Sequence, residues 1–292
     1  MDAALVLHSA EAAVHSTKLR FVWRFLRIVL IGYLLLLLAM MFLEESLLFF
    51  PSKYPEGNWT DPGFPFEDAW FKAADGTQLH GWFVPCDAAL AVALFAHGNA
   101  GNLSHRADYL SNLHQLGVAV LAFDYRGYGR SSGKPSEAGA IADGRAARTW
   151  LAERLKIPES EIVLMGESLG GAVAAQLASE APARGLVLEN TFTSAPDVAA
   201  FHYPWLPVRQ LMRTKLATVD VIKSYHGPLL QVHGDADTIV PFTLGRKLFD
   251  AANEPKQFLV IPGGDHNDPR TPKYFEALDQ FLNRLPPTQS AK

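Results

Sequence analysis

The stretch Ile162-Val163-Leu164-Met165-Gly166-Glu167-Ser168-Leu169-Gly170-Gly171 joins a short apolar run to a segment rich in small residues. The apolar run is typical of a buried strand, and the small residues favour a helix packed closely against it. Gly-x-Ser-x-Gly between a strand and a helix places the serine on a sharp, strained turn with its hydroxyl exposed. Side chains at 166 and 170 would collide with neighbouring backbone in such a turn. We therefore predict that Ser168 is a nucleophile.

Apolar runs and helical patterns alternate around this stretch. The runs favour strands buried on both faces of a parallel sheet, and they lie at 91–95, 118–123, 162–165, 186–189, 229–232 and 258–261. The helical patterns between them lie at about 105–116, 138–155, 169–179, 244–252 and 272–283. Two further segments, 66–72 and 78–84, predict an antiparallel hairpin at the sheet edge. The pattern predicts one doubly wound α/β domain over residues 66–292, with ligands bound at the C-terminal strand ends.

A general base and an acid for Ser168 are predicted at two of those strand ends. His266 lies in the loop between the last predicted strand and the last predicted helix, and Asp237 follows the strand at 229–232. A serine hydroxyl is a poor nucleophile until a base removes its proton, and the base must be oriented by a third group. The order Ser, Asp, His along the chain fits such a triad. We predict that His266 is the base and that Asp237 accepts its other ring N–H.

Several residues compete with these assignments. Asp235 lies two residues before Asp237 and is interpreted as a turn residue, whereas Glu189 at the end of the preceding strand is a further candidate acid. Ser131 and Ser132 are the nearest rival serines, in a turn where serine is common for local reasons. His97 could be mistaken for the base, but we interpret it as bracing the loop that it precedes.

Two backbone N–H groups are expected to hold the oxyanion of a tetrahedral intermediate. Leu169 follows the nucleophile at the start of a helix, whose N-terminus favours negative charge. The second donor is expected from Asn99, in the loop after the strand at 91–95, where Gly98 lets the chain turn. The predicted oxyanion hole therefore consists of the Asn99 and Leu169 amides.

Composition excludes several other function classes. The 292 residues are 49% hydrophobic and carry a net charge of −4, without a basic stripe beyond residue 53, so nucleic-acid binding has no electrostatic support. Cys86 is the only cysteine, which excludes an intramolecular disulfide and a cysteine-based zinc site. The predicted chemistry requires no metal or cofactor.

The N-terminal part differs in kind from the rest. Residues 28–43 carry no charged side chain, and with residues 21–27 they reach the length of about 20 residues that spans a bilayer. We predict a tail over 1–20, a membrane anchor over 21–50 and a lead-in over 51–65. A cleaved signal peptide is the main alternative, but no small-x-small cleavage site follows the run.

Charges flanking the apolar run predict its orientation. Four basic residues precede it and only Lys53 lies close behind it; the four are Lys18, Arg20, Arg24 and Arg27. This asymmetry favours a cytoplasmic N-terminus with the catalytic domain on the opposite side of the membrane. A helix lying along the membrane interface remains open as an alternative.

Four motifs together resemble a known family. They are His-Gly-Asn-Ala-Gly-Asn at 97–102, Asp-Tyr-Arg-Gly-Tyr-Gly-Arg-Ser at 124–131, Gly-Glu-Ser-Leu-Gly-Gly at 166–171 and His-Gly-Asp-Ala-Asp-Thr-Ile-Val-Pro at 233–241. With the lead-in Leu47-Leu48-Phe49-Phe50-Pro51, they are similar to the membrane-anchored α/β-hydrolase-domain proteins, small serine hydrolases with one N-terminal hydrophobic segment. The resemblance covers about residues 28–285.

The resemblance implies an α/β-hydrolase fold with a short cap at about 190–228. It also implies hydrolysis of esters or thioesters, because relatives include depalmitoylating thioesterases and monoacylglycerol-type lipases. Depalmitoylating relatives bind membranes through a palmitoylated, cysteine-rich N-terminus, whereas the one cysteine here is internal, which argues against protein depalmitoylation.

The expected activity is hydrolysis of acyl or lipid-like esters or thioesters at the membrane. A cap this short predicts a shallow, open pocket. Five residues of the cap could line an acyl channel or could equally pack in the core: Phe192, Phe201, Tyr203, Trp205 and Leu206. A serine peptidase is one alternative, and it would need Asp197 or Asp220 of the cap to hold a substrate amine. A non-catalytic binding protein of the same fold is the other.

Overall fold

The computed structural model describes residues 3–60 and 62–286 and divides into two compact units, with the boundary between Leu47 and Leu48. The first unit consists of helix α1 (Ala3–Leu48), whose last residue belongs to the second unit. Residues 3–20 are therefore helical, which differs from the expected tail; residues 1–2 lie outside the described residues. These eighteen positions contain no glycine or proline to interrupt a helix.

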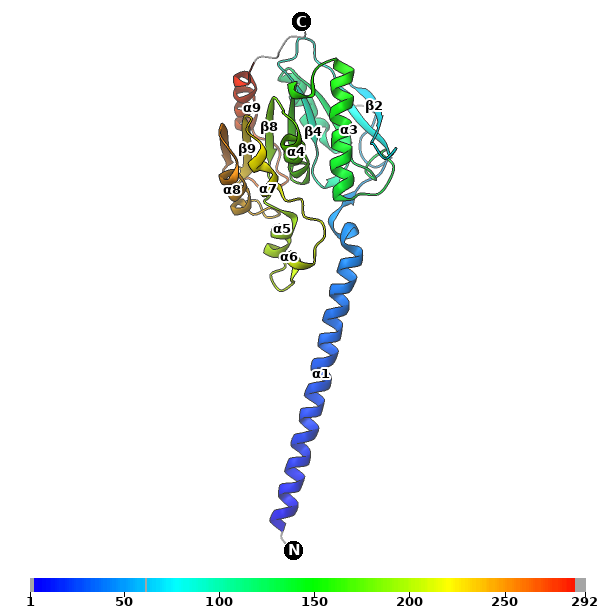
Figure 1. The fold of residues 1–292 in the computed structure, drawn as a ribbon, viewed down its shortest axis with the longest axis vertical. Coiled ribbons are helices and arrows are strands. Elements are labelled where there is room, and N and C mark those ends of the chain that lie inside the picture. The colour runs from blue at the N-terminus through cyan, green and yellow to red at the C-terminus, as the bar shows by residue number, and fades with distance from the viewer. Residues whose placement is uncertain (1–2, 61, 287–292) are drawn as a thin grey trace. The chain divides into compact units, whose positions relative to one another are not determined.

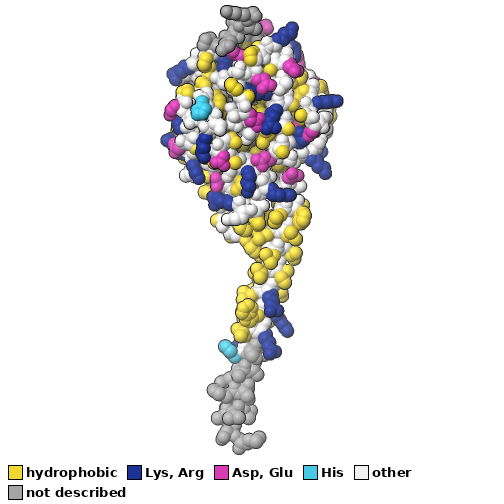
Figure 2. Space-filling model, in the orientation of Figure 1, with side chains coloured by type: hydrophobic (Ala, Val, Ile, Leu, Met, Phe, Trp, Pro, Cys, Tyr) yellow, Lys and Arg dark blue, Asp and Glu magenta, His cyan; other side chains and the backbone are white. Residues whose placement is uncertain are grey.

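Part of α1 is long and apolar enough to cross a membrane. This part is Lys18–Leu48, 31 residues, and its apolar window is unburied. Figure 2 shows it as a yellow stretch with dark blue basic side chains near its N-terminal end. A signal sequence meets the same criteria of length and composition.

The second unit, here called the α/β unit, is built on an eight-stranded sheet. Its strand order is β10 (Lys256–Ile261), β9 (Leu229–Gly234), β8 (Gly185–Glu189), β7 (Ile162–Glu167), β4 (Ala91–Ala96), β6 (Val118–Asp124), β3 (Gln78–Val84) and β2 (Glu67–Lys72). The strands from β10 to β6 pair in parallel, while β3 pairs antiparallel with β6 and with β2. A separate parallel pair joins β1 (Phe50–Pro51) to β5 (Ala100–Gly101). This confirms the predicted mostly parallel sheet with an antiparallel edge.

Helices cover both faces of this sheet. Helices α3 (Glu137–Leu155), α4 (Leu169–Glu180) and α8 (Phe242–Ala251) contribute to one hydrophobic core, and α2 (Ala107–Gln115) and α9 (Pro272–Arg284) contribute to the other (Figure 1). Strand β7 serves both cores, because Leu164 packs on one face and Val163 and Met165 pack on the other. A strand buried on both faces has no polar side, which explains its continuous apolar run.

The cap lies between β8 and β9. It contains the short helices α5 (Ala195–His202), α6 (Val208–Leu211) and α7 (Thr218–Val221), followed by the 3-10 turn η3 (Ile222–Ser224) (Figure 1). Two further 3-10 turns, η1 (Leu103–Arg106) and η2 (Glu159–Glu161), precede α2 and β7. Ser194 caps the N-terminus of helix α5, because its hydroxyl accepts a hydrogen bond from the Asp197 N–H.

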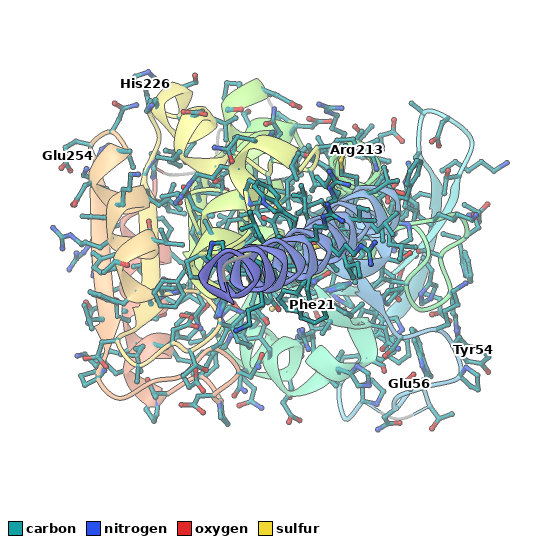
Figure 3. The ribbon with its side chains drawn as sticks, turned by 90° about the horizontal axis from the view of Figure 1, so that it is seen from below. Phe21, Tyr54, Glu56, Arg213, His226 and Glu254 are labelled. Carbon is teal, nitrogen blue, oxygen red and sulfur yellow. The ribbon has the colours of Figure 1, made fainter. Side chains whose placement is uncertain are left out.

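The lead-in packs along the α/β unit. The N–H groups of Ser52 and Tyr54 donate to the carbonyls of Gly101 and Gly129, each at 3.0 Å, and Trp59 is buried. Figure 3 shows Tyr54 and Glu56 at the periphery of this unit, where His226 and Glu254 also lie. The boundary at Leu47–Leu48 also places residues 48–50, expected in the anchor, in the α/β unit. Residue 61 lies outside the described residues.

Candidate active site

Ser168 lies on a strained turn between β7 and α4. Its φ of 53° and ψ of −114° are a backbone conformation that residues other than glycine rarely adopt. A Cβ at Gly166 would overlap the backbone of Gly170, and a Cβ at Gly170 would overlap the carbonyl of Ala96. The glycines of the motif are therefore required by backbone contacts on both sides of Ser168.

Asp237 and His266 meet at the strand ends. His266 Nδ1 lies 2.7 Å from Asp237 Oδ2, and both residues are buried. Asp237 Oδ1 accepts the backbone N–H groups of Ile239 and Val240 at 2.9 and 2.7 Å. Burial alone would raise the pKa of Asp237, but hydrogen bonds from His233 and His266 hold that pKa well below its usual range. The carboxylate is therefore ionised and accepts a hydrogen bond from the imidazole Nδ1–H.

Ser168 and His266 line one cavity. Among the described residues, no hydrogen bond joins the Ser168 hydroxyl to the His266 ring. In unliganded active sites this hydrogen bond is often long and shortens when substrate binds. The structure thus brings all three predicted triad residues to one site, with the Asp237–His266 bond formed.

Glu189 and Asp235 are occupied elsewhere. Glu189 Oε1 accepts hydrogen bonds from the hydroxyls of Tyr109 and Tyr274, both at 2.7 Å. Asp235 Oδ1 accepts the Gly263 N–H at 2.6 Å, which fits its interpretation as a turn residue. Of these carboxylates, only Asp237 is hydrogen-bonded to the His266 ring.

The rival serines and His97 have structural partners. Ser131 Oγ donates to the Asp124 carbonyl at 2.8 Å, and Ser132 Oγ donates to the Gln78 carbonyl at 3.1 Å. The buried His97 ring lies 3.4 Å from Asp124 Oδ1. These contacts tie loops to the sheet.

The two predicted oxyanion donors border the same cavity. Leu169 is the first residue of α4, so its N–H has no partner within the helix. The Asn99 side chain is fixed, because its Nδ2 donates to the Leu48 carbonyl and its Oδ1 accepts the Tyr128 hydroxyl at 3.0 Å. The Asn99 backbone is thereby held at the cavity wall.

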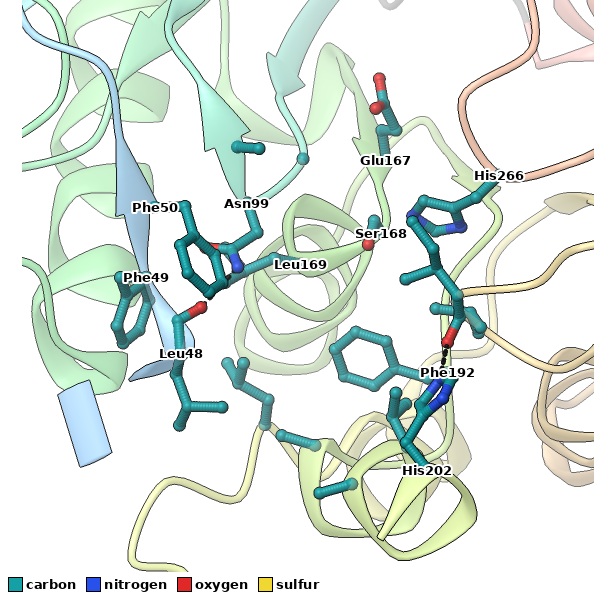
Figure 4. Close-up of a pocket in the computed structure, with 18 of the residues that line it drawn as sticks. Leu48, Phe49, Phe50, Asn99, Glu167, Ser168, Leu169, Phe192, His202 and His266 are labelled. Carbon is teal, nitrogen blue, oxygen red and sulfur yellow. Dashed lines mark hydrogen bonds between the residues drawn. The ribbon is translucent and has the colours of Figure 1, made fainter. Parts of the chain in front are cut away.

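The cavity has a volume of about 370 Å³ and a mostly apolar wall. Figure 4 shows Ser168 and His266 on one side and Leu48, Phe49 and Phe50 on the other. Sequence reasoning missed residues 48–50 as part of this site because their apolar character continues that of α1. Across residues 3–60 and 62–286, no group of three or more His, Cys, Asp or Glu side chains is arranged to hold a metal ion.

The five cap residues considered as the lining of an acyl channel lie in three different environments. Phe192 and Tyr203 line the cavity. Phe201 and Trp205 are 60% and 59% exposed and are not among the described residues that line it, while Leu206 is buried in the cap. Composition alone could not separate these environments, because all five residues have apolar side chains.

An alternating row of charges, here called the ion ladder, lies beside the triad and was not predicted. It consists of Arg106, Glu167, Arg270 and Glu189. Arg270 donates from Nε to Glu189 at 2.7 Å and from Nη2 to Glu167 at 2.8 Å, and Arg106 Nε lies 3.4 Å from Glu167. The Glu167 carboxylate points away from Ser168 (Figure 4). Glu167, the charged residue inside the Gly-x-Ser-x-Gly motif, is the sequence signal that could have indicated a basic partner such as Arg270.

The ladder shifts the pKa values of two of its members, Glu167 and Arg270. Burial alone would raise the pKa of Glu167, but the Arg106 and Arg270 guanidiniums lower it to about 2. Burial alone would lower the pKa of Arg270, but Glu189 and Glu167 raise it well above its usual value. Glu167 and Arg270 are therefore charged at neutral pH.

Asn190 also holds the site together and was not predicted. Its Oδ1 accepts the Gly234 N–H and its Nδ2 donates to the His266 carbonyl, both at 3.1 Å. Its φ of +45° is a left-handed conformation that asparagine tolerates better than most residues. Asn190 thus connects the ends of β8 and β9 to the loop that carries His266.

Comparison with known proteins agrees with this architecture. The family model described as "Serine aminopeptidase, S33" matches residues 87–212. The uncharacterized protein Rv2307c of Mycobacterium tuberculosis is 43% identical over 77% of this chain and 81% of that protein. The α/β hydrolase domain-containing protein WAV2 of Arabidopsis thaliana is 35% identical over 76% of this chain and 80% of that protein.

Among solved structures, the esterase Pf2001 of Pyrococcus furiosus superposes with a TM-score of 0.66 at 23% identity, covering 81% of this chain and 99% of that one. The α/β hydrolase GrgF of Penicillium sp. superposes with a TM-score of 0.63 at 19% identity, covering 76% and 99%. At these identities the likeness shows the fold alone. Together with the relatives at 35–43% identity, these findings show that the chain belongs to the α/β-hydrolase family.

Proposed function

We propose that this chain is a serine hydrolase that cleaves carboxylic esters or thioesters of apolar acyl groups. The supporting observation is the apolar cavity of about 370 Å³ that has Ser168 and His266 in its wall. A cavity of this size and character suits a hydrocarbon chain whose carbonyl carbon lies at the serine hydroxyl.

The proposed reaction passes through an acyl-enzyme. The Ser168 hydroxyl attacks the carbonyl carbon while His266 Nε2 takes its proton, and Asp237 stabilises the imidazolium through Nδ1. The amides of Asn99 and Leu169 stabilise the oxyanion. The bond to the leaving oxygen or sulfur breaks as His266 returns the proton. A water molecule, activated by His266, then releases the acid.

A serine aminopeptidase is the second candidate, because the matching family model has that description. It would need a free carboxylate beside the serine to hold a substrate ammonium. The two cap carboxylates are engaged elsewhere, with Asp197 paired to Arg209 at 3.0 Å and Asp220 to Lys223 at 3.4 Å. Among the described residues, the one acidic side chain that lines the cavity is Glu167, which is paired with arginines. These contacts favour the ester hydrolase.

Labelling by a fluorophosphonate tests the proposed nucleophile. The full-length chain should be labelled on Ser168, and Ser168→Ala should lose both the label and hydrolysis of p-nitrophenyl octanoate. Ser111→Ala on α2 is the matched control and should keep both. Folded wild-type protein that stays unlabelled, or that prefers aminoacyl anilides to acyl esters, contradicts the proposal.

We also propose that α1 anchors the enzyme in a membrane with its N-terminus on the cytoplasmic side. The support is the length and apolar character of Lys18–Leu48 and the basic residues near its start. Full-length protein should resist extraction from membranes by alkaline carbonate, and a tag placed before residue 18 should be protected from protease outside intact cells. Mature protein that lacks the apolar segment would instead identify it as a signal sequence.

A further inference from the structure

A second cavity, of about 350 Å³, also has His266 in its wall. Its wall is polar and includes the whole ion ladder, together with Asp108 and Asn112 of α2 and Asp268 of the loop after His266. We call it the polar cavity, in contrast to the apolar cavity beside Ser168. The two cavities share four lining residues: Arg106, Glu167, His266 and Asn267.

The residues that line the two cavities indicate where the acyl chain and the leaving group of an ester would lie. Ser168 lines the apolar cavity and, among the described residues, is not part of the polar cavity wall, whereas His266 lines both. The serine must reach the carbonyl carbon, and the histidine must reach the leaving oxygen to return the proton. A substrate whose acyl chain fills the apolar cavity therefore directs its leaving group past His266 toward the polar cavity.

We propose that the polar cavity binds the leaving group and selects a small polar alcohol. A cationic amino alcohol is favoured over an alcohol that carries an anionic group. This inference rests on the proposed function, because it assigns the second half of the same substrate. The leaving alcohol departs when the bond between the carbonyl carbon and its oxygen breaks, and it takes the proton that His266 received from Ser168.

The charges in the wall carry the argument for selectivity. Four carboxylates and two guanidiniums line the polar cavity. Arg106 and Arg270 neutralise Glu167 and Glu189 within the ion ladder. Asp108 and Asp268 form no ion pair with any described residue, although Asp268 Oδ2 accepts the Asp265 N–H at 2.8 Å. The cavity therefore has an excess of negative charge, which attracts a cation and repels an anion.

A series of octanoyl esters with a constant acyl group tests this selectivity. Choline and 3,3-dimethylbutanol have the same shape, but only choline is charged, and a glycolate ester supplies an anion. Dividing each kcat/KM by the rate of hydroxide hydrolysis removes differences in intrinsic reactivity. We expect the choline ester to exceed the dimethylbutyl ester by about tenfold and the glycolate ester to be the poorest. This preference should decrease as ionic strength rises from 0.05 to 0.5 M.

Two variants locate the effect. Asp108→Asn should reduce the ratio of choline to dimethylbutyl kcat/KM by about threefold, as expected for the loss of one exposed charge. Asp250→Asn, on α8 and outside the polar cavity, should leave that ratio unchanged.

The outcomes also separate this inference from the proposed function. If p-nitrophenyl octanoate is hydrolysed and Ser168 is labelled, but choline shows no advantage or glycolate is preferred, the inference is wrong and the hydrolase assignment stands. A ratio unaffected by Asp108→Asn overturns it as well. If no ester is hydrolysed and Ser168 is not labelled, the proposed function itself fails.

Discussion

Two carboxylates that follow neighbouring strands have different partners, and the partners distinguish their roles. Asp237 shares its oxygens between the His266 ring and two backbone N–H groups, whereas Glu189 is held by two tyrosines and Arg270. Both lie near His266 at the carboxyl ends of the strands. The hydrogen-bond geometry, and not the residue type, favours Asp237 over Glu189 as the proposed orienting acid.

Replacing Asp237 tests this distinction. Asp237→Asn should lower kcat for p-nitrophenyl octanoate by about 10⁴-fold, because an amide no longer fixes the imidazole tautomer or stabilises the imidazolium. Asp235→Asn, two residues away, keeps an acceptor for the Gly263 N–H and should retain most activity. Steady-state kinetics of both variants provide the comparison. A larger loss from Asp235→Asn would contradict the assignment.

At the scale of elements, the ion ladder connects parts of the fold that are distant along the chain. Arg270 follows the His266 loop, Glu167 ends β7, Glu189 ends β8 and Arg106 ends η1. The Arg270 guanidinium also lies over the Tyr109 ring of α2, at 3.7 Å from its centroid. Because its two carboxylate partners come from neighbouring strands, Arg270 fixes the His266 loop against the end of the sheet.

Removing Arg270 should destabilise the α/β unit strongly. Arg270→Gln leaves the Glu167 and Glu189 carboxylates buried with too little compensating charge, and we expect a loss of about 3–5 kcal/mol. For a unit of this size, that loss corresponds to a fall in Tm of about 10 °C. Arg246→Gln removes a comparable arginine from an exposed pair with Asp250 and should change Tm by about 1 °C. Equal shifts in the two variants would show that the ladder does not stabilise the fold.

The ladder also makes stability depend on pH. Because the pKa of Glu167 is about 2 in the folded unit and 4.5 as its ordinary value, its contribution is fully present above pH 4.5 and is lost as pH falls toward 2. Urea unfolding between pH 6 and pH 3 should therefore show a steeper loss of stability for wild type than for Glu167→Gln. Glu276→Gln, exposed on α9, should follow wild type. Parallel curves for wild type and Glu167→Gln would contradict this expectation.

At the scale of the whole molecule, the α/β unit begins with residues that serve its site. Leu48, Phe49 and Phe50 line the apolar cavity, and β1 pairs with β5 directly beyond Asn99. Leu47 and Leu48 are thus consecutive residues of α1 but belong to different units. The boundary between them is a property of packing and not of composition.

The position of this boundary can be measured by truncation. A chain that starts at Leu48 should hydrolyse p-nitrophenyl octanoate with a KM close to that of the full-length protein. A chain that starts at Ser52 loses the wall formed by residues 48–50 and the pairing of β1, so it should show a higher KM and lower Tm. Equal behaviour of the two truncations would show that residues 48–50 make no contribution to the cavity.

The sequence by itself determined the order of strands and helices, the position of Ser168 on its turn, and the places of Asp237 and His266 at strand ends. These features follow from local patterns, because a strand buried on both faces must be continuously apolar and a tight turn must have glycine where backbones touch. Only the tertiary structure decided that Arg270 bridges Glu167 and Glu189, that Asn190 connects Gly234 to His266, and that residues 48–50 line a cavity. Such contacts join residues far apart in the chain, and their free energy depends on burial and distance, which no local pattern specifies.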